Sequence, residues 1–265
     1  MSAEARNVLS GAIAGVVAGI AASVVTLFAV EPHIEAAIAF EEALAHTSGG
    51  DHSHEVEVVS RGVQASVGVF TSVGLFGAAI GIAVGVAAYA LGRMIPGLSM
   101  RMQAVTATAL AFMAGFLVPY LVYPSNPPAV GSDATLMTRT AMYYAIVGIS
   151  LIAVMSAVVL ARALSKRLGW WESSVVAFGA YLVVVVIAGV LLPTRTELNG
   201  GVNEIPEGFP AGTLADFRIG SLLVAVTMYA VILVVLPAVQ GRMARRAGPS
   251  QPERQADRVP GPVAF

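Results

Sequence analysis

The chain has 265 residues, of which 57% are hydrophobic and only 12% are charged, with a net charge of −1 and no cysteine. Soluble domains carry about 25% charged residues, so this composition predicts a protein whose surface faces lipid. The near-neutral charge gives no sign of a nucleic-acid-binding surface. The lack of cysteine excludes disulfides, thiol catalysis and thiolate metal ligands.

Six apolar segments are each long enough to cross a bilayer as a helix, and none has a charge in its interior. We therefore predict an all-α integral membrane protein with six transmembrane helices. In chain order the spans are expected at about 7–30, 62–91, 102–123, 140–161, 173–193 and 219–240. Residues 1–241 then form one transmembrane domain. The polar segment 242–265, rich in proline and arginine, is expected to be a disordered cytoplasmic tail.

The basic residues are divided unevenly between the two sides of the predicted bundle. Four of the fifteen fall on the side away from the termini, namely Arg61, Arg139, Arg195 and Arg218. Short loops rich in Lys and Arg stay in the cytoplasm. Both termini are therefore expected on the cytoplasmic side of the inner membrane, and the first long connection, 31–60, on its outer side.

This outer connection, 31–60, contains all four histidines of the chain and several carboxylates. Imidazole with carboxylate suits divalent zinc, nickel, copper or cobalt, although affinity alone does not identify the metal. We expect a weak docking site for a metal ion formed by His46, Asp51, His52 and His54. Glu42 shares a helical face with His46 if 32–45 is a short helix, and a deeper step would use His33, Glu31 and Glu35. A solvated acidic loop with incidental histidines is the alternative.

The three outer connections share a plan, because each first span ends at a proline and each second span begins just after an arginine. This pattern suggests three helical hairpins joined on the outside, although proline and arginine are also common at membrane borders. The arginines Arg61, Arg139 and Arg218 should have partners. The candidates are Glu31, Glu35 or Glu57 for the first, Asp133 for the second, and Glu204, Glu207 or Asp216 for the third. Asn126 in a proline-rich loop could line an ion entry or simply complete a turn.

Glycines recur every fourth residue in the first two spans, at 11, 15 and 19 and at 77, 81 and 85. Small residues at this spacing let two membrane helices approach closely, so these spans should pack together. Pro119 should kink the third span near its outer end.

Motifs for catalysis are missing from the sequence. There is no G-x-x-x-x-G-K-[ST] nucleotide loop, no G-x-S-x-G and no H-E-x-x-H. The predicted spans also hold no carboxylate or histidine that could relay protons. We therefore expect no enzyme activity and no permanently bound cofactor, and transport that is passive, driven by the membrane potential or completed by a partner.

Several loop motifs resemble those of the CbtA family of predicted cobalt transporter subunits. The matching pieces are Glu31-Pro-His-Ile34, Glu41-Glu-Ala-Leu-Ala-His46, Arg61-Gly-Val-Gln64, Tyr123-Pro-Ser-Asn-Pro-Pro-Ala-Val-Gly131, Arg139-Thr-Ala-Met-Tyr143, Asn203-Glu-Ile-Pro-Glu-Gly-Phe-Pro210 and Phe217-Arg218. The resemblance implies a membrane subunit for cobalt uptake, linked with cobalamin synthesis. It also implies a small partner, CbtB, with one span and its own histidine-rich end.

The sequence as a whole predicts a membrane subunit that admits a divalent cation from outside, cobalt before nickel, with the outer histidine and carboxylate loop capturing the ion. Two alternatives remain open: a permease for a small organic solute, and a non-conducting scaffold that assembles a transport complex.

Overall fold

The computed structural model describes residues 2–47, 60–131, 133–192 and 205–246, and every regular element in these ranges is helical. The long helices are α1 (Ala3–Ala29), α4 (Val69–Met94), α5 (Met100–Phe112), α7 (Leu136–Leu168), α8 (Trp170–Leu191) and α9 (Ala211–Arg246). Shorter helices are α2 (Glu31–Thr47), α3 (Arg61–Val63) and α6 (Val118–Val122). A 3-10 turn, η3 (Asp133–Thr135), and two π-helical turns, η1 (Gln64–Gly68) and η2 (Met113–Leu117), complete the set.

Six helical stretches in the described ranges are long and apolar enough to cross a membrane. Two of them are composite, because α3, η1 and α4 run together as Arg61–Met94, and α5, η2 and α6 as Met100–Val122. The predicted all-α fold with six spans is confirmed. α9 continues to Arg246 and so includes the first five residues of the expected tail, while 247–265 lie outside the described residues.

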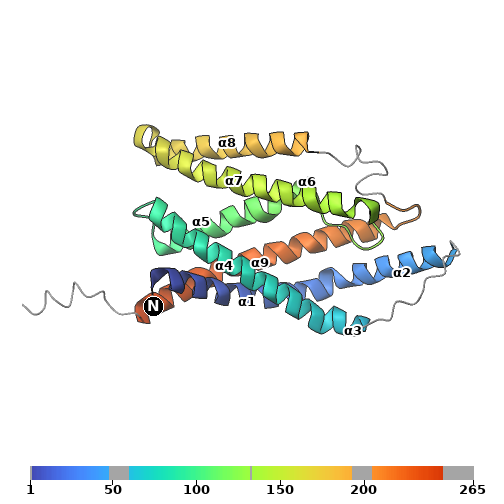
Figure 1. The fold of residues 1–265 in the computed structure, drawn as a ribbon. Coiled ribbons are helices and arrows are strands. Elements are labelled where there is room, and N and C mark those ends of the chain that lie inside the picture. Colours follow the sequence, from blue (N-terminus) through green and yellow to red (C-terminus); the bar gives the residue numbers. More distant parts are fainter. Residues whose placement is uncertain (1, 48–59, 132, 193–204, 247–265) are drawn as a thin grey trace, which may run out of the picture.

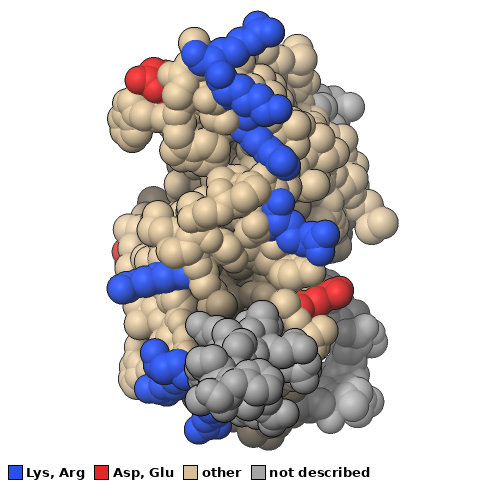
Figure 2. Space-filling view, turned by 90° about the vertical axis from the view of Figure 1, so that its left-hand side faces the viewer, with Lys and Arg blue, Asp and Glu red and all other residues tan. Residues whose placement is uncertain are grey.

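The described parts of the three connections between paired spans lie at one end of the bundle, which we call the loop end (Figure 1). The first and last described residues lie at the opposite end. Figure 2 views that opposite end, where basic side chains are spread over the surface and few acidic ones are visible. We call it the basic end. The helix termini there carry Arg6, Arg93, Arg101, Arg162, Lys166, Arg167, Arg242, Arg245 and Arg246.

The glycines of α1 and α4 form a very close contact between these two helices. A Cβ atom added to Gly81 would lie 2.6 Å from Gly15 Cα, and one added to Gly77 would lie 2.8 Å from Gly19 Cα. No side chain fits in so small a gap, so the two backbones touch directly. The predicted packing of spans one and two through their glycines is confirmed.

Packing divides the bundle into two groups of helices. The larger apolar core joins α1, α4, α5 and α9, with Ala18, Val84 and Ile232 almost fully buried. A smaller core joins α7 and α8 to α5 and η2, and a hydrogen bond of 2.9 Å links the hydroxyls of Ser150 and Tyr181.

The helix ends of all three predicted pairs lie at the loop end, as the hairpin pattern predicted, but the packing does not follow these pairs throughout. The first pair of spans packs as predicted, but α8 lies along α7 and α9 packs on α1 and α5. The fifth and sixth spans are therefore joined at the loop end without forming a hairpin of their own. A long connection between two helices does not oblige them to pack together, so the loops alone could not determine the pairing.

The regular α-helix of the third span is interrupted next to Pro119, where a kink was predicted. Proline has no N–H to donate to the preceding turn of a helix and its ring crowds that turn. In the structure a π-helical turn, η2, precedes Pro119, which lies in the first turn of α6. The wider turn contains Gly115 and Phe116, and both line cavities described below.

We expect Gly81→Ala to destabilise the bundle, because its methyl group would press against the backbone of α1. Overpacking of this kind costs about 1–3 kcal/mol. The matched control is Gly74→Ala in the same helix, where an added Cβ would meet nothing within 4 Å. Thermal unfolding of the purified protein in detergent measures both variants. Equal stability of the two variants would contradict the proposed backbone contact.

Candidate functional site

The loop end has a small apolar core of its own, formed by three separate segments. Ala37 of α2, Val130 of the loop after α6, and Phe209, just before α9, are buried together with Leu214. The rings of Phe40 and Phe209 meet edge to face with their centroids 5.1 Å apart. These contacts fix α2 and the two proline-rich loops relative to one another over the end of the bundle.

Arg61, the first residue of α3, forms an ion pair with Glu31 at the start of α2. Glu31 is only 7% exposed, so its charge is largely removed from water and depends on this partner. Glu31 was one of three predicted partners for Arg61. The pair ties the beginning of the second span to the end of the first.

Arg218 in α9 binds the loop that follows α6. Its Nη2 donates to Asn126 Oδ1 at 2.8 Å and its Nε donates to the Ser125 carbonyl at 3.4 Å. In turn, the Tyr120 hydroxyl donates to the Arg218 carbonyl at 2.6 Å. The loop oxygens were not among the partners predicted for Arg218. Asn126 therefore has a structural contact with α9.

Arg139 in the first turn of α7 binds the same loop from the other side. Its Nη1 donates to the Val130 carbonyl at 3.4 Å, and its guanidinium occupies the space where a side chain on Gly131 would lie. Gly131 has a φ of +99°, which L residues with a Cβ rarely adopt. Two arginines from different spans thus hold the loop 123–131 in place.

Between this loop and the helix ends lies a pocket of about 770 Å³, which we call the outer pocket. Its polar lining includes Glu41 of α2, Asn126, Arg139 and Ser221, together with the tyrosines 120, 123, 143 and 144. Burial raises the pKa of Tyr123 above its ordinary range, so this phenol stays protonated and can donate a hydrogen bond. Within the described residues the outer pocket offers one carboxylate and several neutral oxygens to a ligand.

The predicted metal-binding residues have different places in the structure. Glu42 and His46 are exposed on α2, one turn apart, and His33 and Glu35 lie in its first turns. In the described ranges no three His, Asp or Glu side chains come close enough to hold a metal ion. Asp51, His52, His54 and Glu204 lie outside the described residues. Glu207 is exposed in the turn before α9.

The outer pocket contains groups that the sequence interpretation did not single out as site residues. In the sequence, Glu41 and Tyr123 appear only within the motifs that resemble those of the CbtA family, and no binding role was predicted for Tyr120. Their convergence depends on α2 packing against the loop 123–131, which no local pattern encodes. The prolines of that loop were the one sequence feature that indicated a binding site there, because rigid loops often present fixed polar groups.

We expect Arg61→Leu to lower the thermal stability more than Arg61→Leu combined with Glu31→Leu. The single change leaves a buried carboxylate without its partner, and the double change removes both charges. The interaction energy between such neighbouring residues is about 0.5–3 kcal/mol, measured by comparing both single variants with the double variant. Glu35→Leu, at an exposed position of the same helix, is the control. Additive effects of the two single changes would show that the pair contributes nothing.

Comparison with known proteins supplies a family for this geometry. A family model described as "Probable cobalt transporter subunit (CbtA)" matches residues 4–240, from the first turn of α1 to the last turns of α9. That description is of transport and not of catalysis. No curated protein and no solved structure matches. The match covers all the loop-end segments described above, and the chain therefore belongs to the CbtA family of probable cobalt transporter subunits.

Proposed function

We propose that this chain is the membrane-embedded subunit of a cobalt uptake system, and that the ion arrives at the loop end. The family match over 4–240 is the observation that carries this proposal. The six apolar helices support it, because they are what an integral transport subunit needs. Nickel is the second candidate ion, since both metals accept nitrogen and oxygen ligands.

The proposed orientation places the basic end in the cytoplasm of the cell and the loop end outside the inner membrane. The distribution of arginines over the basic end supports it, because basic residues are retained on the cytoplasmic side. Carboxylates gather on the opposite side, where they would raise the local concentration of a cation before entry.

Capture is assigned to the connection 31–60 and to the outer pocket beneath it. His46 and Glu42 lie one turn apart on the exposed face of α2, and Glu41 of the same helix lines the outer pocket. The proposal adds Asp51, His52 and His54 as further ligands. Exposed ligands on a helix suit weak and reversible binding, which an uptake step requires.

The membrane interior has no comparable ligands. The sequence of the six predicted spans contains no Asp, Glu or His, so a divalent ion would leave carboxylate and imidazole behind at the loop end. A membrane potential of 100 mV supplies about 4.6 kcal/mol to a doubly charged ion, which helps it to cross but does not replace lost hydration. We therefore propose a partner subunit, a small single-span protein of CbtB type, that supplies ligands along the route.

The lack of Asp, Glu and His in the predicted spans also supports a second candidate function. If the chain conducts nothing itself, it would act as a scaffold that positions a conducting partner and concentrates metal at the loop end. The apolar lining of the cavity between α4 and α7, about 570 Å³ in volume, favours this alternative over a permease for polar solutes.

Uptake by reconstituted vesicles tests the proposal. We expect vesicles that contain this chain and its small partner to accumulate radioactive cobalt when the interior is negative, and vesicles without protein to remain tight. If the chain alone suffices, the partner is dispensable. If the chain and partner together give no uptake above empty vesicles, the transport proposal is wrong.

Substitutions at the loop end test the capture step. We expect His46→Ala, His52→Ala and His54→Ala together to raise the cobalt concentration for half-maximal uptake about tenfold and to leave the maximal rate unchanged. Glu41→Gln should act in the same direction, because it removes the carboxylate of the outer pocket. Glu172→Gln at the basic end is the control. Unchanged half-saturation in the loop-end variants would exclude the proposed capture role.

A further inference from the structure

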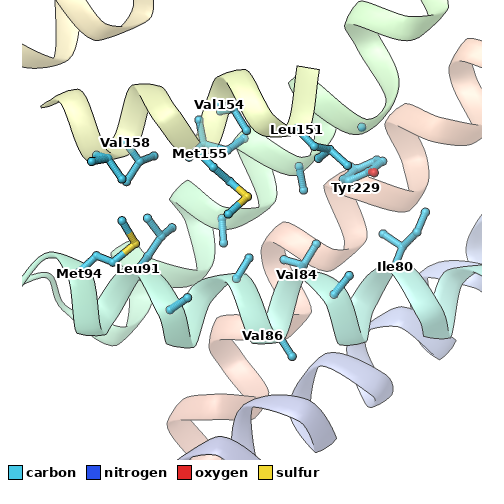
Figure 3. Close-up of a pocket in the computed structure, with 18 of the residues that line it drawn as sticks. Ile80, Val84, Val86, Leu91, Met94, Leu151, Val154, Met155, Val158 and Tyr229 are labelled. Atoms are coloured by element: carbon cyan, nitrogen blue, oxygen red, sulfur yellow. The ribbon is translucent and has the colours of Figure 1, made fainter. Parts of the chain in front are cut away.

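The second large cavity of the bundle is a lateral groove between α4 and α7, with a volume of about 570 Å³. Figure 3 shows side chains of both helices pointing into the gap, with α5 and α9 behind it. Apart from Tyr229 at the loop-end side, the lining is apolar. The lateral groove therefore offers contact area to a hydrocarbon and almost nothing to an ion.

The edges of the lateral groove are exposed at the depth of the transmembrane segments. Met155 is 68% exposed, Phe76 62% and Val159 55%, and α4 and α7 do not pack extensively on each other in the described chain. A groove with such edges opens sideways to lipid. Its contents must come from the bilayer, because the larger core closes it on the side of α1 and α9.

The dimensions of the lateral groove fit a hydrocarbon chain better than a helix. Along α4 the lining extends from Phe76 to Met94, a separation of eighteen residues, or about 27 Å at 1.5 Å per residue. One leaflet contributes about 15 Å of hydrocarbon thickness, so the lateral groove is long enough for an acyl chain from one leaflet. Dividing about 570 Å³ by the length of the lateral groove gives a mean cross-section of ~21 Å², about a quarter of the ~80 Å² that a helix 10 Å across occupies.

Positive charge lies at the end of the lateral groove that reaches the basic end. Arg162 follows Val158 by one turn of α7, so it lies on the same helix face just beyond the lining. It is exposed and forms no ion pair with the described residues. Arg93 lies in the last turn of α4 at the same end of the bundle, but its Nη1 donates to the Tyr89 hydroxyl at 3.2 Å, and Tyr89 does not line the lateral groove. An anionic phosphate at the end of the lateral groove would therefore meet the guanidinium group of Arg162.

We propose that the lateral groove binds one acyl chain of an anionic phospholipid from the leaflet at the basic end. The phosphate lies against Arg162, and the chain runs between α4 and α7 toward the ring of Tyr229 at mid-depth. This inference is independent of the transported ion. Charge complementarity at one end and an apolar lining along the remaining length select a phospholipid over a free fatty chain or a polar solute.

Photolabelling of the full-length protein in vesicles tests the proposal. The probe is phosphatidylglycerol with a diazirine at the end of one acyl chain, compared with phosphatidylcholine that carries the same group. We expect the phosphatidylglycerol label on peptides of α4, α7 and α9 that line the lateral groove. Arg162→Gln should reduce this labelling about fivefold and bring it to the level of phosphatidylcholine. Arg167→Gln, at the same end of α7, should leave it unchanged.

A second variant keeps the test valid if the headgroup contact is weak. Ala90 is exposed on α4 within the lateral groove, so Ala90→Phe fills the space without entering the core. It should remove labelling of the groove peptides by both probes, whereas Val186→Phe on the lipid-facing side of α8 should not. Labelling spread evenly over all lipid-facing helices would overturn the proposal. So would loss of labelling when the small partner subunit is present, because the lateral groove would then belong to a protein partner.

Discussion

A charge is costly inside a bilayer, and this constraint sorts the ionic groups of the chain to the two ends of the bundle. At the basic end the arginines remain spread over the surface. At the loop end the three arginines that begin the second span of each pair turn toward oxygen atoms: Arg61 to Glu31, Arg139 to the Val130 carbonyl, and Arg218 to Asn126. All three hold the loops through these oxygen atoms, and the charge of Arg61 is also compensated by the Glu31 carboxylate.

The same constraint determines what the two cavities can do. The outer pocket has oxygen atoms in its lining and lies at the loop end, so it is the proposed place for a partly hydrated cation. Below it, Phe116 of η2 still lines the outer pocket, while the neighbouring Gly115 already lines the lateral groove. The change from polar to apolar surroundings thus takes place within one turn of helix. An ion that goes deeper must bring its water or receive ligands from another chain, which is why a partner is part of the proposal.

Much of the fold follows from features that are local in the sequence. The length and apolar composition of the segments predicted six helices. The recurrence of glycine at every fourth residue predicted the contact of α1 with α4. Both patterns can be recognised within a few helical turns of sequence. The pairing of α8 with α7 was not predictable from the connections. Arg218 and Asn126 are 92 residues apart, and Glu41 reaches the outer pocket only through the position of α2. Such contacts depend on the packing of whole helices, so residue types and spacing identified the three arginines and included Glu31 among the candidates for Arg61, but did not identify the loop oxygens that bind Arg139 and Arg218.

The lateral groove lies along the boundary, or seam, between the two groups of helices. There the pair α7 and α8 contacts the rest of the bundle mainly through α5, η2 and α6. The side chains that face the lateral groove therefore lack neighbours on one side. Each such side chain forgoes about 0.1–0.2 kcal/mol for every missing atomic contact, which adds up over a surface of this length. A hydrocarbon chain in the lateral groove restores those contacts without binding the two groups rigidly. Lipid would then complete the packing of the bundle beside Gly115, at the point where the seam reaches the outer pocket.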